Sequence, residues 1–136
     1  MFLVDTNVVS QMRKPRPVPE VASWWRKHIM SEMFLSAVTL HELRFGIELA
    51  PSGAKRDGLE QWLVEYLIPA FAGRILPVDL SVADMCGRLA AKSKARGSSP
   101  ELADALIAAT AKVHGLRVAT LNRKHFDRLG VELVTF

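Results

Sequence analysis

Short apolar runs alternate with longer segments of helical periodicity along this chain, and this alternation restricts the possible folds more than any other feature of the sequence. The apolar runs are bounded by turn-forming residues, which predicts strands at residues 2–4, 33–35, 74–78, 117–120 and 131–136. The longer segments predict helices at about residues 19–31, 38–50, 55–72, 81–96 and 100–114. This order predicts a three-layer α/β/α fold around a mostly parallel, five-stranded twisted sheet.

The length and composition of the chain fit one domain. With 136 residues it can bury a substantial core, but it is too short for two independent cores. Hydrophobic residues make up 49% and charged residues 24%, which are values of ordinary globular proteins and exclude a chain that stays disordered. Residues 1–136 are therefore expected to form a single folded domain.

Membrane and redox functions find little support in the sequence. The segment that begins at Met1 has no basic leader and soon reaches Asp5, so we expect neither a signal peptide nor a membrane anchor there. No later apolar run approaches the roughly 20 residues that span a bilayer. Cys86 is the only cysteine, which excludes an intrachain disulfide and a thiolate metal site. We expect a cytoplasmic protein without a membrane partner.

The net charge of +4 suits a protein that meets phosphate backbones, although many proteins with such an excess bind no nucleic acid. Two basic groups could follow an RNA backbone, one along a predicted helix and one near residue 122. The first group is Arg88, Lys92 and Arg96, and the second is Arg123, Lys124 and Arg128. A solvated surface is the alternative for both groups, and we favour it for the first.

Asp5 stands where a ligand site is expected in an open parallel sheet, beyond the carboxyl end of a strand. It follows the first apolar run directly, and Thr6 and Asn7 then turn the chain. We therefore expect its carboxylate to project into a crevice. The alternative is that Asp5 only caps the next short helix, which is a common task for aspartate.

Glu42 adjoins the apolar stripe of its predicted helix, which consists of Leu43, Ile47 and Ala50. Gly46 lies one turn later on the same side, and glycine inside a helix costs about 1 kcal/mol relative to alanine. Close approach of backbone or ligand would explain this glycine. The alternative for Glu42 is a solvated side chain paired with a neighbouring arginine.

Asp104 shares its helical face with Ile107, Ala108 and Ala111, so its carboxylate is expected to point towards the core. Burial of an ionised acid is costly unless the acid is paired, hydrogen-bonded or bound to a metal, and no basic residue nearby in sequence offers itself. Three carboxylates without histidine or cysteine ligands suit Mg²⁺ or Mn²⁺ rather than zinc. Such ions act on phosphodiesters by activating water and neutralising charge.

Four segments of the chain, in this order, resemble the PIN-domain family, and most closely the VapC-type toxins of VapBC toxin-antitoxin pairs and the FitB-like proteins. They are Leu-Val-Asp-Thr-Asn at 3–7, residues 36–50 around Glu42, Ala-Asp-Ala-Leu-Ile-Ala-Ala-Thr-Ala at 103–111, and Ala-Thr-Leu-Asn at 119–122. The resemblance implies an Mg²⁺- or Mn²⁺-dependent endoribonuclease in which Asp5, Glu42 and Asp104 bind the metal. It also implies that Thr6 holds Asp5 or a metal-bound water by a hydrogen bond.

The same resemblance implies the partners of the protein. They are an RNA substrate of unspecified class (tRNA, rRNA or mRNA), a small antitoxin that also binds operator DNA, and a second copy of the chain. Asn122 departs from the family pattern, because members often carry a fourth acid at this place. An amide brings no negative charge, which favours one metal ion over two. The alternative for Asn122 is a turn residue in a loop. Among the histidines, only His125 is expected near the site.

Other functions remain as alternatives. A phosphatase of the haloacid-dehalogenase type is disfavoured, because Asn7 stands where its general acid should be. A phosphate-receiving signalling domain would need paired acids near the first strand. A non-catalytic binding module of the same fold and a housekeeping, structure-specific nuclease both stay open. Retention of all three acids disfavours the binding module, and an adjacent reading frame for a DNA-binding antitoxin would favour the toxin over the housekeeping nuclease.

Overall fold

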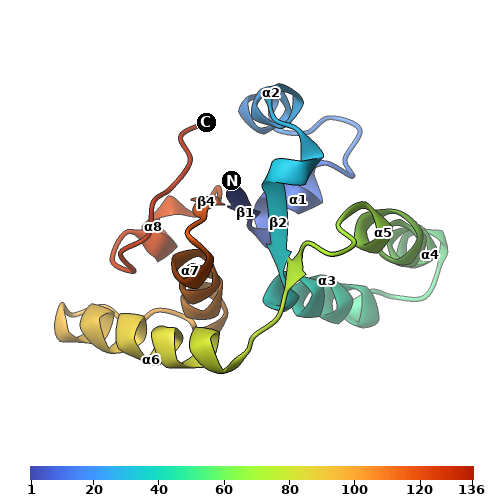
Figure 1. The fold of residues 1–136 in the computed structure, drawn as a ribbon. Coiled ribbons are helices and arrows are strands. Elements are labelled where there is room, and N and C mark those ends of the chain that lie inside the picture. The colour runs from blue at the N-terminus through green and yellow to red at the C-terminus, as the bar shows by residue number, and fades with distance from the viewer.

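The computed structural model describes residues 1–136, and its centre is a parallel sheet. The four strands are β1 (Phe2–Val4), β2 (Met33–Ser36), β3 (Ile75–Leu76) and β4 (Arg117–Ala119). Their order across the sheet is β3-β2-β1-β4, and every pairing is parallel (Figure 1). The strand that begins the chain therefore lies in the interior of the sheet, between β2 and β4.

Helices occupy the connections between the strands. The first connection contains α1 (Thr6–Gln11), α2 (Pro19–Lys27) and the 3-10 turn η1 (Met30–Glu32). The second contains α3 (Ala37–Leu49), α4 (Ala54–Gln61), the π-helical stretch η2 (Trp62–Leu67) and α5 (Ile68–Ala70). The third contains α6 (Leu80–Ala95) and α7 (Leu102–His114), and α8 (Arg123–Phe126) follows β4. None of these helices has the length and apolar character of a membrane span.

Side chains that alternate along the strands divide the core into two layers. Phe2 and Val4 pack with apolar residues of α1, α2 and η2, whereas Leu3 packs with residues of α6, α7 and α8. Val118 and Ala119 of β4 divide between the two layers in the same way. Because successive residues of a strand face opposite sides, this is the three-layer α/β/α arrangement that the sequence predicts.

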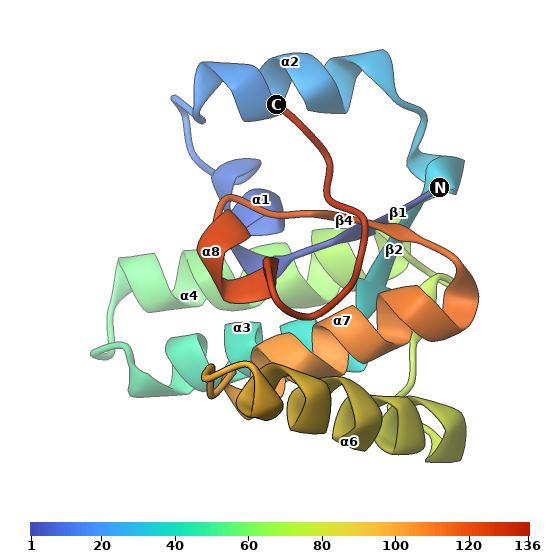
Figure 2. The same ribbon diagram turned by 90° about the vertical axis from the view of Figure 1, so that its left-hand side faces the viewer.

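The predicted fifth strand at residues 131–136 is wrong. This segment forms only one isolated parallel bridge, between Leu133 and Val118. Beyond the bridge, the ring of Phe136 packs against Trp24 of α2, with 5.6 Å between ring centroids. Figure 2 shows the end of the chain running from the sheet towards α2. Packing of the last aromatic residue against α2 therefore draws the segment away from β4 before a longer ladder forms.

Two helix predictions also need correction. The helix predicted at residues 55–72 is divided into α4, η2 and α5, with the buried side chains of Leu63 and Leu67 in the π-helical stretch. The helix predicted from Pro100 begins at Leu102 instead, with Glu101 as its N-cap. The predicted loop after Asn122 contains the helical turn α8. This turn carries Lys124 and His125.

Candidate active site

The carboxyl ends of β1 and β4 lead to one end of the molecule, and the candidate site is built there. Asp5 follows β1, and Thr120 follows β4. Figure 2 shows the beginnings of α1 and α7 and the short α8 gathered at this end. The parallel pairing of β1 with β4 thus places residues more than a hundred positions apart in sequence beside one another. This is the edge at which open parallel sheets bind ligands.

Asp5 is buried, with 4% of its surface exposed, and its carboxylate accepts three hydrogen bonds. Oδ1 accepts the backbone N–H of Thr6 at 2.7 Å, and Oδ2 accepts the Thr120 hydroxyl at 2.8 Å and the Asn7 amide at 3.1 Å. Asp5 therefore does cap α1, as the alternative interpretation held, but its second oxygen is held by side chains of the site. Burial raises the pKa of Asp5, although these hydrogen bonds favour its ionised form.

Thr6 connects Asp5 to Glu42. Its backbone N–H holds Asp5, while its hydroxyl donates to Glu42 Oε1 at 2.8 Å and lies 3.2 Å from Thr39 Oγ1. The resemblance implied that Thr6 holds Asp5 or a bound water. In the structure Thr6 contacts Asp5 through its main chain, and its side chain orients the second acid.

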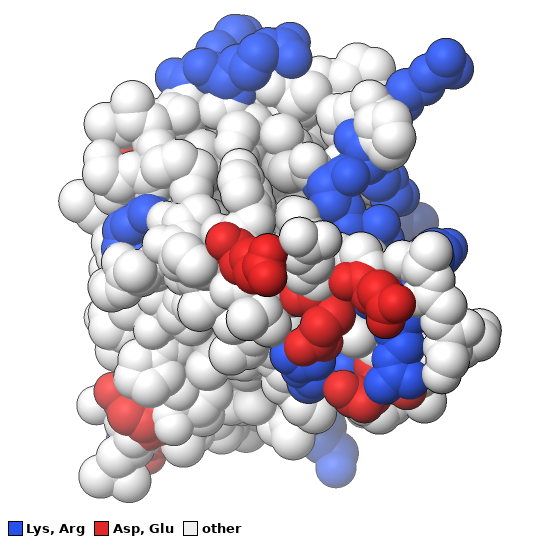
Figure 3. Space-filling model, turned by 90° about the vertical axis from the view of Figure 1, so that its right-hand side faces the viewer, with Lys and Arg blue, Asp and Glu red and all other residues white.

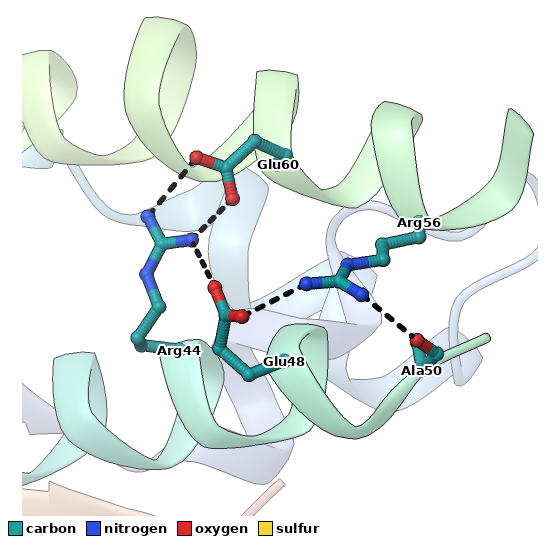
Figure 4. Close-up of polar contacts among 5 residues, drawn as sticks. All are labelled: Arg44, Glu48, Ala50, Arg56 and Glu60. Atoms are coloured by element: carbon teal, nitrogen blue, oxygen red, sulfur yellow. Dashed lines mark hydrogen bonds and ion pairs between the residues drawn. The ribbon is translucent and has the colours of Figure 1, made fainter. Parts of the chain in front are cut away.

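Glu42 does not pair with an arginine, which was the alternative for this residue. Arg44, two residues later on α3, instead binds Glu60 of α4 and lies 3.4 Å from Glu48, and Arg56 binds Glu48 at 2.8 Å (Figure 4). Figure 3 shows acidic and basic side chains side by side over this corner of α3 and α4. Because these arginines are occupied, the Glu42 carboxylate faces the site with Thr6 as its only hydrogen-bond partner.

Gly46 lines a hollow of about 270 Å³ that also borders Thr6 and Glu42. Apart from the adjoining residues and backbone of α3 itself, no heavy atom lies within 4 Å of the place where a Cβ on Gly46 would stand. The explanation that another backbone segment closely approaches Gly46 is therefore wrong. The glycine leaves the space beside Glu42 open.

Asp104 lies in the first turn of α7 with 15% of its side chain exposed. Its Oδ2 is 3.1 Å from Nδ1 of His125 on α8. The sequence offered no nearby basic partner, and the structure corrects this expectation with a histidine 21 residues later. Burial raises the pKa of Asp104, and the charges of Glu101 and Glu42 raise it further, whereas His125 lowers it.

The three predicted metal ligands lie within reach of one another's charge. The charge of Asp104 contributes to the raised pKa of Asp5, and that of Glu42 to the raised pKa of Asp104. No three His, Cys, Asp or Glu side chains converge tightly enough to form a ready-made metal site. Repulsion among like charges favours such an open arrangement. The oxygen donors still fit a hard divalent cation, which would remove that repulsion.

Asn122 is exposed, and its side chain makes no hydrogen bond within the protein. Its backbone N–H donates to the Thr120 hydroxyl at 3.0 Å, and Thr120 in turn donates to Asp5. Asn122 therefore lies next to the support of Asp5, while the side chain that contacts Asp104 is that of His125. The sequence patterns did not single out Thr120 as a site residue. Its position directly after an apolar strand was the one signal that could have indicated this role.

A comparison with known protein families matches residues 2–132 of the chain to the PIN domain. The chain belongs to the PIN-domain family. It is 41% identical to "Toxin FitB" of Neisseria gonorrhoeae over 93% of this chain and 91% of that protein, and 37% identical to "VapC ribonuclease Y4jK" of Sinorhizobium fredii over 98% and 96%. A chain of the solved structure of FitAB bound to an IR36 DNA fragment superimposes with a TM-score of 0.92 at 37% identity, covering 98% of this chain and 94% of that one.

The contact between His125 and Asp104 allows a test of the metal site that the sequence predicts for this PIN-domain protein. Loss of a side chain that hydrogen-bonds a metal ligand typically lowers metal affinity by about 10- to 100-fold. His125→Ala is expected to weaken Mn²⁺ binding by about tenfold, at the lower end because His125 is exposed. His125→Asn places an amide N–H near the position of Nδ1 and is expected to restore most of the affinity.

Isothermal titration calorimetry of Mn²⁺ checks this prediction. His114→Ala removes an exposed histidine at the end of α7 and serves as the control. Equal Mn²⁺ affinity in wild type and His125→Ala would show that this hydrogen bond does not support the metal ligand.

Proposed function

We propose that this protein is a metal-dependent endoribonuclease that hydrolyses RNA phosphodiester bonds as the toxin of a type II toxin-antitoxin system. The observation that carries the proposal is the connection of Asp5 to Glu42 through Thr6, with Asp104 within range of both charges. The sequence similarity to a VapC ribonuclease and to Toxin FitB over almost the whole chain supports a ribonuclease activity and a role as a toxin.

Asp5, Glu42 and Asp104 are the residues that would hold Mg²⁺ or Mn²⁺. When bound, the ion lowers the pKa of a water molecule and neutralises charge on the phosphodiester. The chain itself orients the ligands. Thr120 and Asn7 hold one oxygen of Asp5, and the Thr6 hydroxyl donates a hydrogen bond that orients Glu42. Because Asn122 adds no charge, we propose one metal ion rather than two.

The proposed partners follow from the same relationships. The FitAB structure holds a chain similar to this one in an assembly on DNA. We propose that this chain likewise binds a small antitoxin that contacts operator DNA, that it forms a homodimer, and that it acts in the cytoplasm. An acidic site of three carboxylates suits inhibition by an arginine side chain of such an antitoxin.

Purified protein without antitoxin should be incubated with total RNA in Mg²⁺, in Mn²⁺ and in EDTA. Discrete RNA fragments are expected with either ion and none in EDTA, because the carboxylates alone cannot neutralise the charge that develops on the phosphate. The 5′ ends of the fragments, mapped by sequencing, then give the substrate class. Intact RNA under every condition would instead favour the non-catalytic binding module, and cleavage in EDTA would indicate a contaminating nuclease.

A further inference from the structure

A second hollow, of about 250 Å³, borders Asp104 and shares no lining residue with the hollow that Gly46 borders. It lies between the loop before α7 and the short helix α8. The residues that line it are polar or charged apart from one proline: Ser98, Ser99, Pro100, Glu101, Asp104, Lys124 and His125. Pro100 and the imidazole of His125, which contacts Asp104, are the only lining groups on which a base could stack, and the other side chains that border the hollow carry hydroxyl, carboxylate or ammonium groups.

Lys124 is the free cation of this region. The other two members of the basic group predicted from the sequence are engaged with main-chain oxygens. Arg123 donates to the Val134 carbonyl at 2.8 Å, and Arg128 donates to the Arg96 carbonyl at 2.6 Å. Lys124 is exposed, borders the hollow and makes neither a hydrogen bond nor an ion pair. Its ammonium group is therefore available to a ligand.

The serine hydroxyls complete a set of donors on the opposite wall. The side chains of Ser98 and Ser99 make no hydrogen bond within the protein, and both border the hollow. A flexible ammonium group and two hydroxyls are donors that phosphate oxygens accept. They contact the backbone of a nucleic acid without reading its bases.

Two carboxylates also line the hollow, and they decide where an anion can lie. Under the proposed function, the charge of Asp104 is offset by the metal ion, while Glu101 remains exposed to solvent at the N-cap of α7. An anion would therefore lie towards Lys124 and the serines, beside the metal site.

We propose that this hollow binds the RNA phosphate next to the one that is cleaved, with Lys124 as the principal contact and Ser98 and Ser99 as hydrogen-bond donors. The inference rests on the proposed function, because it assumes an RNA strand that passes Asp104. A contact to phosphate does not depend on the sequence of the RNA. Its role is to position the strand beside Asp104. Selection among RNA sequences must then come from other surfaces of the protein.

The test compares Lys124→Ala with Lys27→Ala, which removes the same charge from the exposed end of α2, away from Asp104. Binding of a short fluorescein-labelled single-stranded RNA of mixed sequence is measured by anisotropy, with Ca²⁺ in place of Mg²⁺. Lys124→Ala is expected to weaken binding by roughly threefold to tenfold and to lower the slope of log affinity against log salt by about 0.7. Lys27→Ala is expected to leave both unchanged. Lys124→Ala should weaken binding of an abasic oligomer of the same length by the same factor, because the lost contact is to phosphate and not to a base.

Separate outcomes distinguish this inference from the proposed function. If Lys124→Ala and Lys27→Ala bind RNA alike, the phosphate site is wrong, even when wild type cleaves RNA. If Lys124→Ala weakens binding of the base-containing RNA but not of the abasic oligomer, the hollow contacts a base and the inference is also overturned. If wild type cleaves no RNA, the proposed function fails, and the difference in binding between the two variants still decides whether the hollow binds phosphate.

Discussion

Asp104→Asn is expected to lower the rate of RNA cleavage in Mg²⁺ by about 100- to 1,000-fold, and Asp5→Asn by a similar factor. Each substitution keeps the size of the side chain but removes one negative charge from the group that would hold the ion. Loss of the metal removes several kcal/mol of stabilisation of the charge on the phosphate, and each factor of ten in rate corresponds to about 1.4 kcal/mol. Single-turnover cleavage of the RNA identified by fragment mapping measures the effect.

A matched control separates this effect from a general loss of negative charge. Asp84 lies exposed on α6, where it pairs with Arg88 at 3.0 Å, and Asp84→Asn is expected to cleave RNA at the wild-type rate. Thermal unfolding of each variant confirms that it is folded. If folded Asp5→Asn and Asp104→Asn cleave RNA as fast as wild type, these acids do not form the catalytic site, and the nuclease activity belongs to another surface or to a contaminant.

The sequence predicts the positions of the acids where one local pattern determines the environment. Asp5 follows an apolar strand, and such a strand end in a parallel sheet faces a crevice, so its burial in the site could be expected. Asp104 stands on an apolar face of α7, which predicts its partial burial and the need for a partner. The local pattern alone did not assign Glu42 to the site, because a glutamate beside an apolar stripe is more often solvated.

The contacts of these acids depend on tertiary structure that no local pattern contains. His125 meets Asp104 because α8 turns the chain directly after β4, and a helix of four residues is too short for periodicity to reveal. The hydroxyl of Thr6 reaches Glu42 rather than Asp5 because α3 passes beside α1, which is a consequence of how two helices pack. The strand predicted at residues 131–136 does not form for a similar reason, since the packing of Phe136 on Trp24 competes with strand pairing.

Without a metal ion, the protein is expected to lose stability as the pH rises from the ordinary pKa of aspartate, 3.8, through the raised pKa values of Asp5 and Asp104. The pKa values of Asp5 and Asp104 are raised above their usual value of 3.8 in the folded state. In this pH range the unfolded chain has already released these protons, while the folded chain still holds them. The unfolded state therefore binds fewer protons, and the free energy of unfolding falls with rising pH until both groups ionise in the folded state.

Glu60 acts in the opposite direction, because Arg44 lowers its pKa and the stability from this pair is lost as the pH falls. Since the pair is exposed to solvent, its contribution is small, and comparison with Asp104→Asn separates it from the effect of the buried acids. In EDTA, this variant is expected to show a weaker decline in stability with rising pH than wild type, because one of the two buried acids no longer titrates.

Mn²⁺ is expected to reverse the loss, because a divalent cation binds the ionised carboxylates of the folded state. At a concentration about 100 times the dissociation constant it contributes about 2.7 kcal/mol, which corresponds to a rise of roughly 10 °C in Tm for a domain of this size. Calorimetric scans at several pH values, with Mn²⁺ and with EDTA, measure both effects. The rise in Tm should grow with pH and be largely lost in Asp104→Asn, while Asp84→Asn retains it. A Tm that does not respond to Mn²⁺ at any pH would mean that the three carboxylates do not form a metal site.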